Sequence, residues 1–363
     1  MDLSAPRPGQ AAMAKAYLSS GPQAEQERLR VTASQSLVKK AKEEGRVLVF
    51  GTVEIDEFAG WKKAFERKYP GIELEYQRRY VPGTPPPMAQ KIMDDTEAGR
   101  ETADAVIVAV PPLLQFRKLD LLAKAKSKET SAYPKDVLQP QGYWFPIVSI
   151  GMIQVYNPKL VSAKELPRTA LDLVDPKWKG AIVAHDLGIG TLGAYWLASL
   201  RPILGEQKWK KLTEGLAKNK TKLYPLYDTV VDSVDSGEEK IGLTVLLHDY
   251  LKAVEAKRQL RQLKLKDVPT MLTFNAIAKT TAGRHPASTQ LLIDFLLSEE
   301  GQKLVGSTYL RIPARTKVDA PYSLDKVAPK EKFVSFPNEA TLKKAPDSIA
   351  TLARLFGTRK HNL

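Results

Sequence analysis

The fold is predicted from one stretch, which opens with the apolar run Val47-Leu48-Val49-Phe50-Gly51 and closes with Ala105-Val106-Ile107-Val108-Ala109. Such runs are typical of parallel strands, which are covered on both faces. Between the two runs the pattern predicts a helix over 56–69, a strand over 72–76 and a helix over 87–98. Strand, helix, strand, helix and strand in this order predict a parallel α/β sheet.

The rest of the chain also alternates between predicted strands and helices. A helix is expected over 12–44, ended by Gly45. The segment 144–156 predicts two strands that break near Gly151. Further strands are expected over 180–184, 221–227, 241–245 and 276–278, and further helices over 191–204, 206–217, from about 248 and over 286–305. We expect two α/β lobes with interleaved backbone: an extension over 1–40, lobe 1 over 41–147 and 276–363, and lobe 2 over 148–275.

The amino-acid composition excludes several classes of function. The chain has 363 residues, the length of about two domains, with 43% hydrophobic and 26% charged residues, which excludes wholesale disorder. It has no cysteine, so disulfides, thiolate nucleophiles and cysteine-based metal sites are excluded. Its four histidines show neither H-x-x-H nor H-E-x-x-H spacing, which argues against a metalloprotease.

The net charge is +14, from 55 basic and 41 acidic residues. Such a charge favours binding to nucleic acid, to an anionic membrane surface or to an acidic ligand. The basic residues are scattered over polar helix faces without a nucleic-acid-binding motif, so a solvated surface is the favoured interpretation. Nucleic-acid binding stays an alternative, which steeply salt-dependent DNA binding would support. No apolar run approaches the roughly 18 residues of a membrane span, and the segment 1–23 lacks the lysine-rich start and apolar core that are typical of a secretion signal.

A glycine-rich segment runs from Gly188 to Gly193 and matches G-x-G-x-x-G after a predicted strand. A dinucleotide site also needs an acidic residue about 20 positions later, at the end of the next strand. Glu214 has that distance but lies in an amphipathic helix. Three interpretations of the segment therefore stay open. It belongs to a nucleotide-dependent enzyme, it binds an anion through the amides of Gly190 and Thr191, or its glycines only cap the helix and turn the chain.

No nucleophile elbow, P-loop or spaced catalytic trio occurs, so the sequence predicts a binding protein, not an enzyme, with no cofactor. In an open α/β sheet, ligands bind beyond the carboxyl ends of the strands. Some of the residues at the carboxyl ends of the strands could bind a hard cation and others an anion, so the sequence does not predict whether a metal is bound. The candidate ligand contacts are Thr52, Glu54, Arg79, Tyr80, Ser149, Gly190, Thr191, Tyr227, Asp228, His248, Asp249 and Tyr250.

Several segments between 41 and about 315 occur in the order of a known family. The most specific is Leu171-Asp172-Leu173-Val174-Asp175-Pro176-Lys177-Trp178-Lys179-Gly180, and others lie at 41–45, 65–72, 97–106, 155–158 and 285–302. The chain resembles the type II periplasmic solute-binding proteins of ABC importers, in the branch of ferric-iron, thiamine and phosphonate binders. The resemblance implies an α/β, two-lobe periplasmic-binding-protein-like fold of type II with a ligand cleft between the lobes.

The resemblance also implies hinge closure on a small solute, delivery to an ABC transporter permease, and a periplasmic or extracellular location. We expect a monomer that binds no nucleic acid and meets the membrane only through the permease. Ferric relatives use two adjacent tyrosines where this chain has His248-Asp249-Tyr250, and a histidine where it has Glu54. A small anion (a carboxylate, phosphonate or phosphate ester) is therefore the expected solute, and ferric-iron transport is the alternative.

Overall fold

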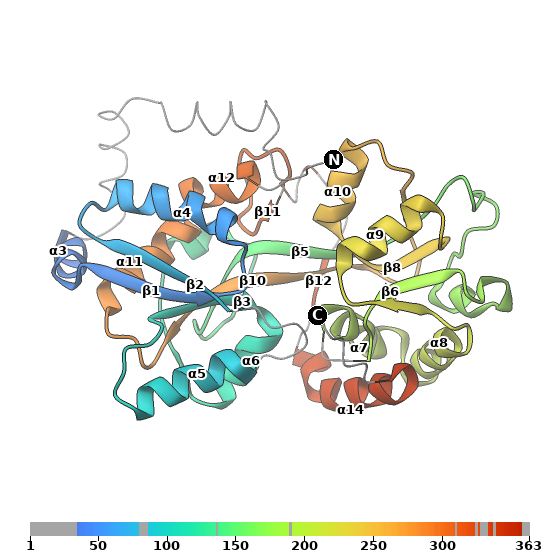
Figure 1. The fold of residues 1–363 in the computed structure, drawn as a ribbon, viewed down its shortest axis with the longest axis horizontal. Coiled ribbons are helices and arrows are strands. Elements are labelled where there is room, and N and C mark those ends of the chain that lie inside the picture. Colours follow the sequence, from blue (N-terminus) through green and yellow to red (C-terminus); the bar gives the residue numbers. More distant parts are fainter. Residues whose placement is uncertain are drawn as a thin grey trace. The chain divides into compact units, whose positions relative to one another are not determined.

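A computed structural model describes residues 35–79, 86–135, 137–188, 191–308, 311–323, 326, 333–336 and 339–357 (Figure 1). The chain divides into two compact units. Unit 1 comprises Met1–Ser149 and Phe274–Pro329, and unit 2 comprises Ile150–Thr273 and Lys330–Leu363. Within the described residues, no helix combines the length and the apolar character needed to cross a bilayer.

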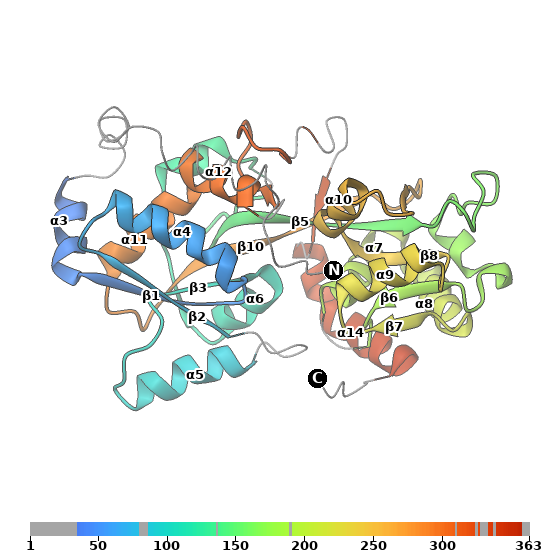
Figure 2. The same ribbon diagram turned by 45° about the horizontal axis from the view of Figure 1, so that its top comes forward.

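The sheet of unit 1 is built on three parallel strands, β1 (Arg46–Gly51), β2 (Glu73–Arg78) and β3 (Ala105–Ala109). The strand β10 (Thr270–Thr280) pairs with β3 in the antiparallel direction. Helices α4 and α11 cover one face of this sheet, and α5 and α6 cover the other (Figures 1 and 2). The remaining bounds in unit 1 are α3 (Gln35–Glu44), α4 (Ile55–Lys68), α5 (Pro86–Glu97), α6 (Val110–Lys118), β4 (Leu122–Ala123), η1 (Lys128–Ala132), α11 (Pro286–Leu297), α12 (Glu299–Thr308) and β11 (Ile312–Pro313).

Burial explains why the apolar run of β1 forms a central strand. Leu48 and Phe50 share one core cluster with Ile92 of α5 and Phe116 of α6. The alternate residue Val49 points to the opposite face and is also fully buried. Both faces of β1 are therefore covered by helices, and the predicted parallel α/β arrangement of this stretch is confirmed.

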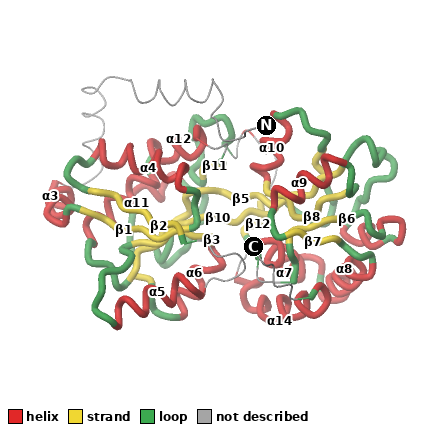
Figure 3. The backbone as a smooth tube through the Cα atoms, in the orientation of Figure 1, coloured by secondary structure: helices red, strands yellow, loops and turns green. Residues whose placement is uncertain are grey.

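The sheet of unit 2 has the strand order β5-β8-β6-β7. The strand β6 (Ile182–His185) runs parallel to β7 (Lys222–Tyr224) and β8 (Ile241–Leu246), and β8 is antiparallel to β5 (Phe145–Tyr156). Helices α7, α8 and α14 lie on one face and α9 and α10 on the other (Figures 1 and 3). The remaining bounds are η2 (Ala170–Val174), η3 (Pro176–Trp178), α7 (Leu192–Leu204), α8 (Glu206–Lys218), α9 (Tyr227–Ser236), α10 (Leu247–Glu255), β9 (Arg261–Leu263), β12 (Phe333–Ser335) and α14 (Glu339–Phe356).

The predicted strand break near Gly151 is wrong, because β5 runs without interruption. A Cβ atom on Gly151 would lie 2.9 Å from the Cβ of Leu247, the first residue of α10. The glycine therefore allows a helix to approach the strand closely, which no local pattern reveals.

One helix prediction and one strand prediction also need correction. The expected single helix over 286–305 is two helices, because Ser298 adopts an extended conformation between α11 and α12. The expected strand over 221–227 ends at Tyr224, and Tyr227 begins helix α9. The expected helix over 12–44 is described only as α3, and its earlier part lies outside the described residues.

The carboxyl-terminal segment belongs to unit 2, whereas the expected boundaries placed it in lobe 1. Its helix α14 packs against α7 and α8. Leu352 is fully buried in the core of unit 2, and Ser348 Oγ accepts a 3.0 Å hydrogen bond from Arg201 Nη1. These contacts give the chain end a structural role in unit 2.

Candidate functional site

In unit 1, the parallel strands end at one edge of the sheet, which carries several predicted contacts. The amide of Thr52, just after β1, donates to the carbonyl of Ile107 over 3.0 Å. The amide of Arg79, just after β2, donates to the carbonyl of Gly51 over 2.8 Å. These bonds bring Thr52 and Arg79 together at the carboxyl edge of unit 1.

Arg78 and Glu54 form an ion pair at this edge. Glu54 is the residue before α4, and its side chain is 57% exposed. The carboxylate therefore has a cationic partner within the protein, and solvent screens both charges.

Arg79 differs from its neighbour because no described carboxylate lies within ion-pair distance of its guanidinium. That group lies over the ring of Phe50, 4.6 Å from the centroid, and Nη2 donates to Gln77 Oε1 over 2.6 Å. Its Nε is buried without a hydrogen-bond partner in the described part of the chain. Arg79 thus holds a half-buried positive charge without an anionic partner among the residues that the structure describes.

A rigid aromatic pair supports the same edge. Tyr76 stacks on Phe58 with ring centroids 3.9 Å apart, and its hydroxyl donates to the carbonyl of Val53 over 2.7 Å. Burial raises the pKa of Tyr76 well above its usual range. Tyr76 is therefore a neutral phenol that fixes the loop after β1.

In unit 2, the ends of β6, β7 and β8 lead into α7, α9 and α10. His185 is the last residue of β6 and stacks on Tyr227, with centroids 3.8 Å apart and ring planes within 7° of each other. The Tyr227 hydroxyl oxygen accepts a 3.2 Å hydrogen bond from the amide of Gly193. Tyr227 is one of the predicted contacts, whereas His185 is not, although its position at the end of an apolar strand was an available signal.

Thr191 has a structural role at the start of α7. Its hydroxyl accepts from the amide of Ala194 over 3.2 Å and donates to the carbonyl of Asp186 over 2.6 Å. The carboxylate of Asp186 is fully buried and accepts from the amide of Gly188 over 2.7 Å. The loop after β6 is therefore held by its own side chains.

Close packing explains the first glycine of the G-x-G-x-x-G match. A Cβ atom on Gly188 would lie 1.8 Å from the carbonyl oxygen of Gly357, at the end of α14. The amide of Gly193 already donates to Tyr227. These contacts support the interpretation of glycines that cap and turn, rather than a dinucleotide site.

Replacing Gly188 by alanine is expected to lower the free energy of unfolding by about 1–3 kcal/mol, because the new methyl group must displace the end of α14. Gly193→Ala is the control, since its Cβ would lie 3.4 Å from the nearest atom. Thermal unfolding measures both variants. Equal melting temperatures for the two would show that the Gly357 contact is not tight.

The other predicted contacts fall in three places. His248 is buried at the start of α10, with Nε2 3.5 Å from Asp249 Oδ1, and Tyr250 follows half-buried. Asp228 is exposed in the first turn of α9 and accepts from the amide of Thr229. Ser149 is buried in β5, where its hydroxyl donates to the carbonyl of Pro313 over 3.3 Å. Tyr80 and Gly190 lie outside the described residues.

The carboxyl edge of unit 2 has a distinctive composition. The residues described at this edge are Asp186, Asp228, Asp249, His185, His248, Tyr227 and Tyr250, which supply carboxylate, imidazole and phenol groups without a lysine or arginine among them. In the described ranges, no group of three histidine, aspartate or glutamate side chains is placed to hold a metal ion. The two units therefore present edges of opposite character.

The chain is similar to several known proteins. The model of the family "Bacterial extracellular solute-binding protein" matches residues 101–345. The Fe(3+)-binding periplasmic protein of Serratia marcescens is 22% identical over 169 residues, which is 45% of this chain and 49% of the relative. The major ferric iron-binding protein of Neisseria meningitidis serogroup A is 22% identical over 194 residues, 51% and 56% of the two chains. The chain thus spans about half the length of the curated relatives that it matches.

Solved structures cover more of the chain. Iron-bound HitA from Pseudomonas aeruginosa superposes with a TM-score of 0.68 at 24% identity, over 86% of this chain and 99% of HitA. AfuA from Actinobacillus pleuropneumoniae, with fructose-6-phosphate bound, superposes with a TM-score of 0.65 at 22% identity, over 86% and 97%. The predicted fold class, that of the periplasmic binding proteins, is confirmed.

Proposed function

Because the chain belongs to the family of bacterial extracellular solute-binding proteins, we propose that it captures a small anionic solute for an ABC importer. The solute is a carboxylate, phosphonate or phosphate ester, and the permease of the importer receives it. The relatives reported above are solute-binding transport proteins and not enzymes. We extend the proposal to a monomer that works in the periplasm or outside the cell.

The observation that carries the proposal is the charge of Arg79, which has no carboxylate partner within the described ranges. A half-buried cation without an anionic partner costs free energy, which a bound anion recovers. A guanidinium presents several N–H donors in a plane and matches the two oxygens of a carboxylate or phosphate. The hydroxyl of Thr52, at the same edge, adds a donor or an acceptor.

A screen for thermal stabilisation by small carboxylates, phosphonates and phosphate esters, followed by calorimetry of the best solute, tests this proposal. We expect saturable binding of one class, weakened by salt because the contact is electrostatic. Stabilisation by none of the anions, together with stabilisation by ferric salts, would contradict it.

Ferric-iron transport is the second candidate, because unit 2 offers oxygen and nitrogen ligands that suit a hard cation. The relatives of Serratia and Neisseria are named for iron. Tyr195, on α7, is a poor ligand, since burial raises its pKa and keeps the phenol neutral. For this second candidate we assign the iron-binding phenolate to Tyr227, which stacks on His185 at the carboxyl edge of unit 2, where Tyr250 also lies.

Tyr227→Phe separates the two candidates, since phenylalanine keeps the stack on His185 and removes only the oxygen. If iron is the solute, the variant loses the visible iron–phenolate absorption and binds ferric iron at least tenfold more weakly. If an anion is the solute at Arg79, the affinity for it changes less than threefold. Titrations of both variant and parent with each solute measure the difference.

A further inference from the structure

Gln77 lies beside Arg79 at the carboxyl edge of unit 1. Gln77 belongs to β2 and Arg79 follows the end of that strand, two positions later, so their side chains point to the same face of the sheet. Phe50 is the register partner of Gln77 on β1, and the Arg79 guanidinium lies over its ring. Gln77, Phe50 and Arg79 therefore form one contiguous group of side chains.

The hydrogen bond between Arg79 and Gln77 fixes the orientation of the amide. Arg79 Nη2 donates to Gln77 Oε1 over 2.6 Å, and no other described residue accepts a hydrogen bond from this guanidinium. A guanidinium only donates, so the amide oxygen faces it and Nε2 occupies the other end of the same small planar group. Gln77 is exposed, and its Nε2 donates to no acceptor among the described residues. Two N–H donors next to the guanidinium are therefore available to a ligand.

Gln77 also occupies a position where a carboxylate would neutralise Arg79. The preceding residue on this face of β2 is Glu75, which forms a 2.6 Å ion pair with Arg46. A glutamate in place of Gln77 would have the same length and would present an oxygen to the same nitrogen of Arg79. The neutral amide therefore holds the guanidinium without cancelling its charge.

We propose that Gln77 is a specificity-determining residue of the anion site. Its Oε1 positions the guanidinium of Arg79, and its Nε2 donates to a second oxygen of the bound anionic group. A guanidinium and a carboxamide side by side match a group with two or more oxygens, such as a carboxylate or a phosphonate. The inference rests on the proposed function, because it concerns the solute bound at Arg79.

Gln77→Glu tests the inference, because it exchanges the two N–H donors for a charged oxygen without changing the length of the side chain. Acetate and methylphosphonate are the probes, each titrated into the protein and followed by protein-observed NMR. We expect the variant to bind both probes at least tenfold more weakly than the parent, since the new charge lies next to the bound anion. Gln77→Met has neither the donors nor the charge, and we expect a loss of about threefold.

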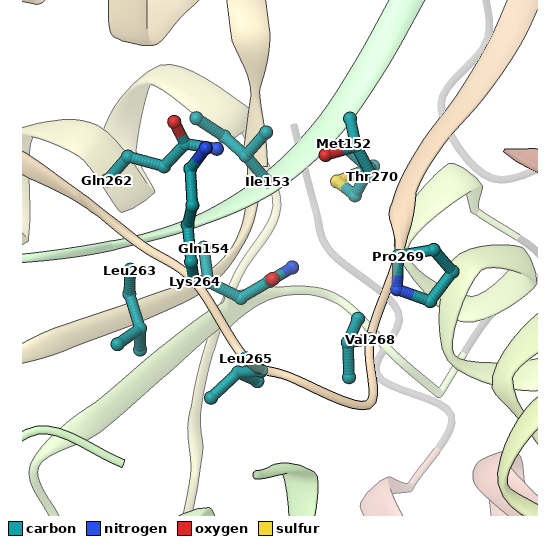
Figure 4. A pocket seen from close by; sticks show the side chains of 10 residues that line it. All are labelled: Met152, Ile153, Gln154, Gln262, Leu263, Lys264, Leu265, Val268, Pro269 and Thr270. Atoms are coloured by element: carbon teal, nitrogen blue, oxygen red, sulfur yellow. The ribbon is translucent and has the colours of Figure 1, made fainter. Parts of the chain in front are cut away.

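Two controls separate this contact from a general effect of charge. Gln115→Glu adds the same charge at an exposed position on α6. Lys264→Gln removes the only charged side chain from the lining of a cavity of about 220 Å³ in unit 2, between β9 and the start of β10 (Figure 4). We expect both variants to bind the probes within twofold of the parent, because the anion binds at Arg79.

A measurement without solute tests the contact between the two side chains. The carboxyl group introduced by Gln77→Glu is expected to titrate about half a pH unit lower than in the double variant Gln77→Glu/Arg79→Gln, since only the first retains the cation. Carbon-detected NMR of the labelled carboxyl group measures both titrations. Equal titration in the two variants would overturn the positioning role of Gln77.

The binding results distinguish a failure of this inference from a failure of the proposed function. If the probes bind the parent, are lost in Arg79→Ala and bind Gln77→Glu as tightly as the parent, the inference is overturned and the anion site stands. Equal losses in Gln77→Glu and Gln115→Glu, or a loss in Lys264→Gln as large as that in Gln77→Glu, would overturn the inference as well. A parent that binds neither probe would overturn both.

Discussion

Replacing Arg79 by alanine is expected to weaken binding of the anionic solute more than tenfold. The guanidinium is half-buried, lies over Phe50 and has no carboxylate partner among the described residues. Charge-assisted hydrogen bonds to such a group contribute about 1.5–3 kcal/mol, and a tenfold loss corresponds to about 1.4 kcal/mol. Calorimetric titration of parent and variant with the solute from the anion screen measures the change.

Arg78→Ala is the matched control, because Arg78 is the preceding residue, has the same charge and is paired with Glu54. The affinity of this variant for the solute is expected to stay within threefold of that of the parent. The comparison therefore distinguishes the loss of a direct contact from a general loss of positive charge. Arg79→Lys keeps the charge but loses the planar group, and we expect an intermediate affinity. Equal losses in Arg78→Ala and Arg79→Ala would remove Arg79 from the site.

Replacing Asp104 by alanine is expected to lower the free energy of unfolding of unit 1 by about 3 kcal/mol or more. This carboxylate is 1% exposed and lies directly before β3. Its Oδ2 accepts from the amide of Leu48 over 2.8 Å and is 2.9 Å from His285 Nδ1, and its Oδ1 accepts from the amide of His285 over 2.9 Å. Alanine leaves the buried amide of Leu48 and the two half-buried groups of His285 without an acceptor and disconnects β1 and the start of α11.

Glu101→Ala is the control for this variant. Glu101 is 33% exposed and its Oε1 lies 3.9 Å from the same histidine, so its loss is expected to cost less than about 1 kcal/mol. Urea unfolding followed by circular dichroism compares the two. If Asp104→Ala is no less stable than Glu101→Ala, the three hydrogen bonds do not hold unit 1 together.

The alternation of strands and helices was predictable because it is a local property. Apolar runs such as Val47–Gly51 are covered on both faces, and the helix after each run shows its own periodicity. The failures depend on contacts between distant residues. Gly151 is needed because Leu247 packs closely against it, and the position of α14 depends on the core of unit 2. Neither feature has a local sequence pattern.

The candidate site was predictable only in part, for a similar reason. The topology rule pointed to the ends of strands and so selected Arg79 and Tyr227. It did not reveal that Arg78 has an ion-pair partner whereas Arg79 has none among the described residues, since the two are neighbours at the end of the same strand. It also selected Ser149, whose hydroxyl is bonded to Pro313, and it missed His185, which becomes recognisable only through its stack on Tyr227.

Native mass spectrometry of the purified protein, before and after denaturation, tests the central claim most directly. We predict a mass difference that matches one small carboxylate, phosphonate or phosphate ester, released on denaturation and absent from Arg79→Ala. A retained iron atom without an accompanying anion, present in the parent and in Arg79→Ala alike, would contradict the claim and favour ferric-iron transport.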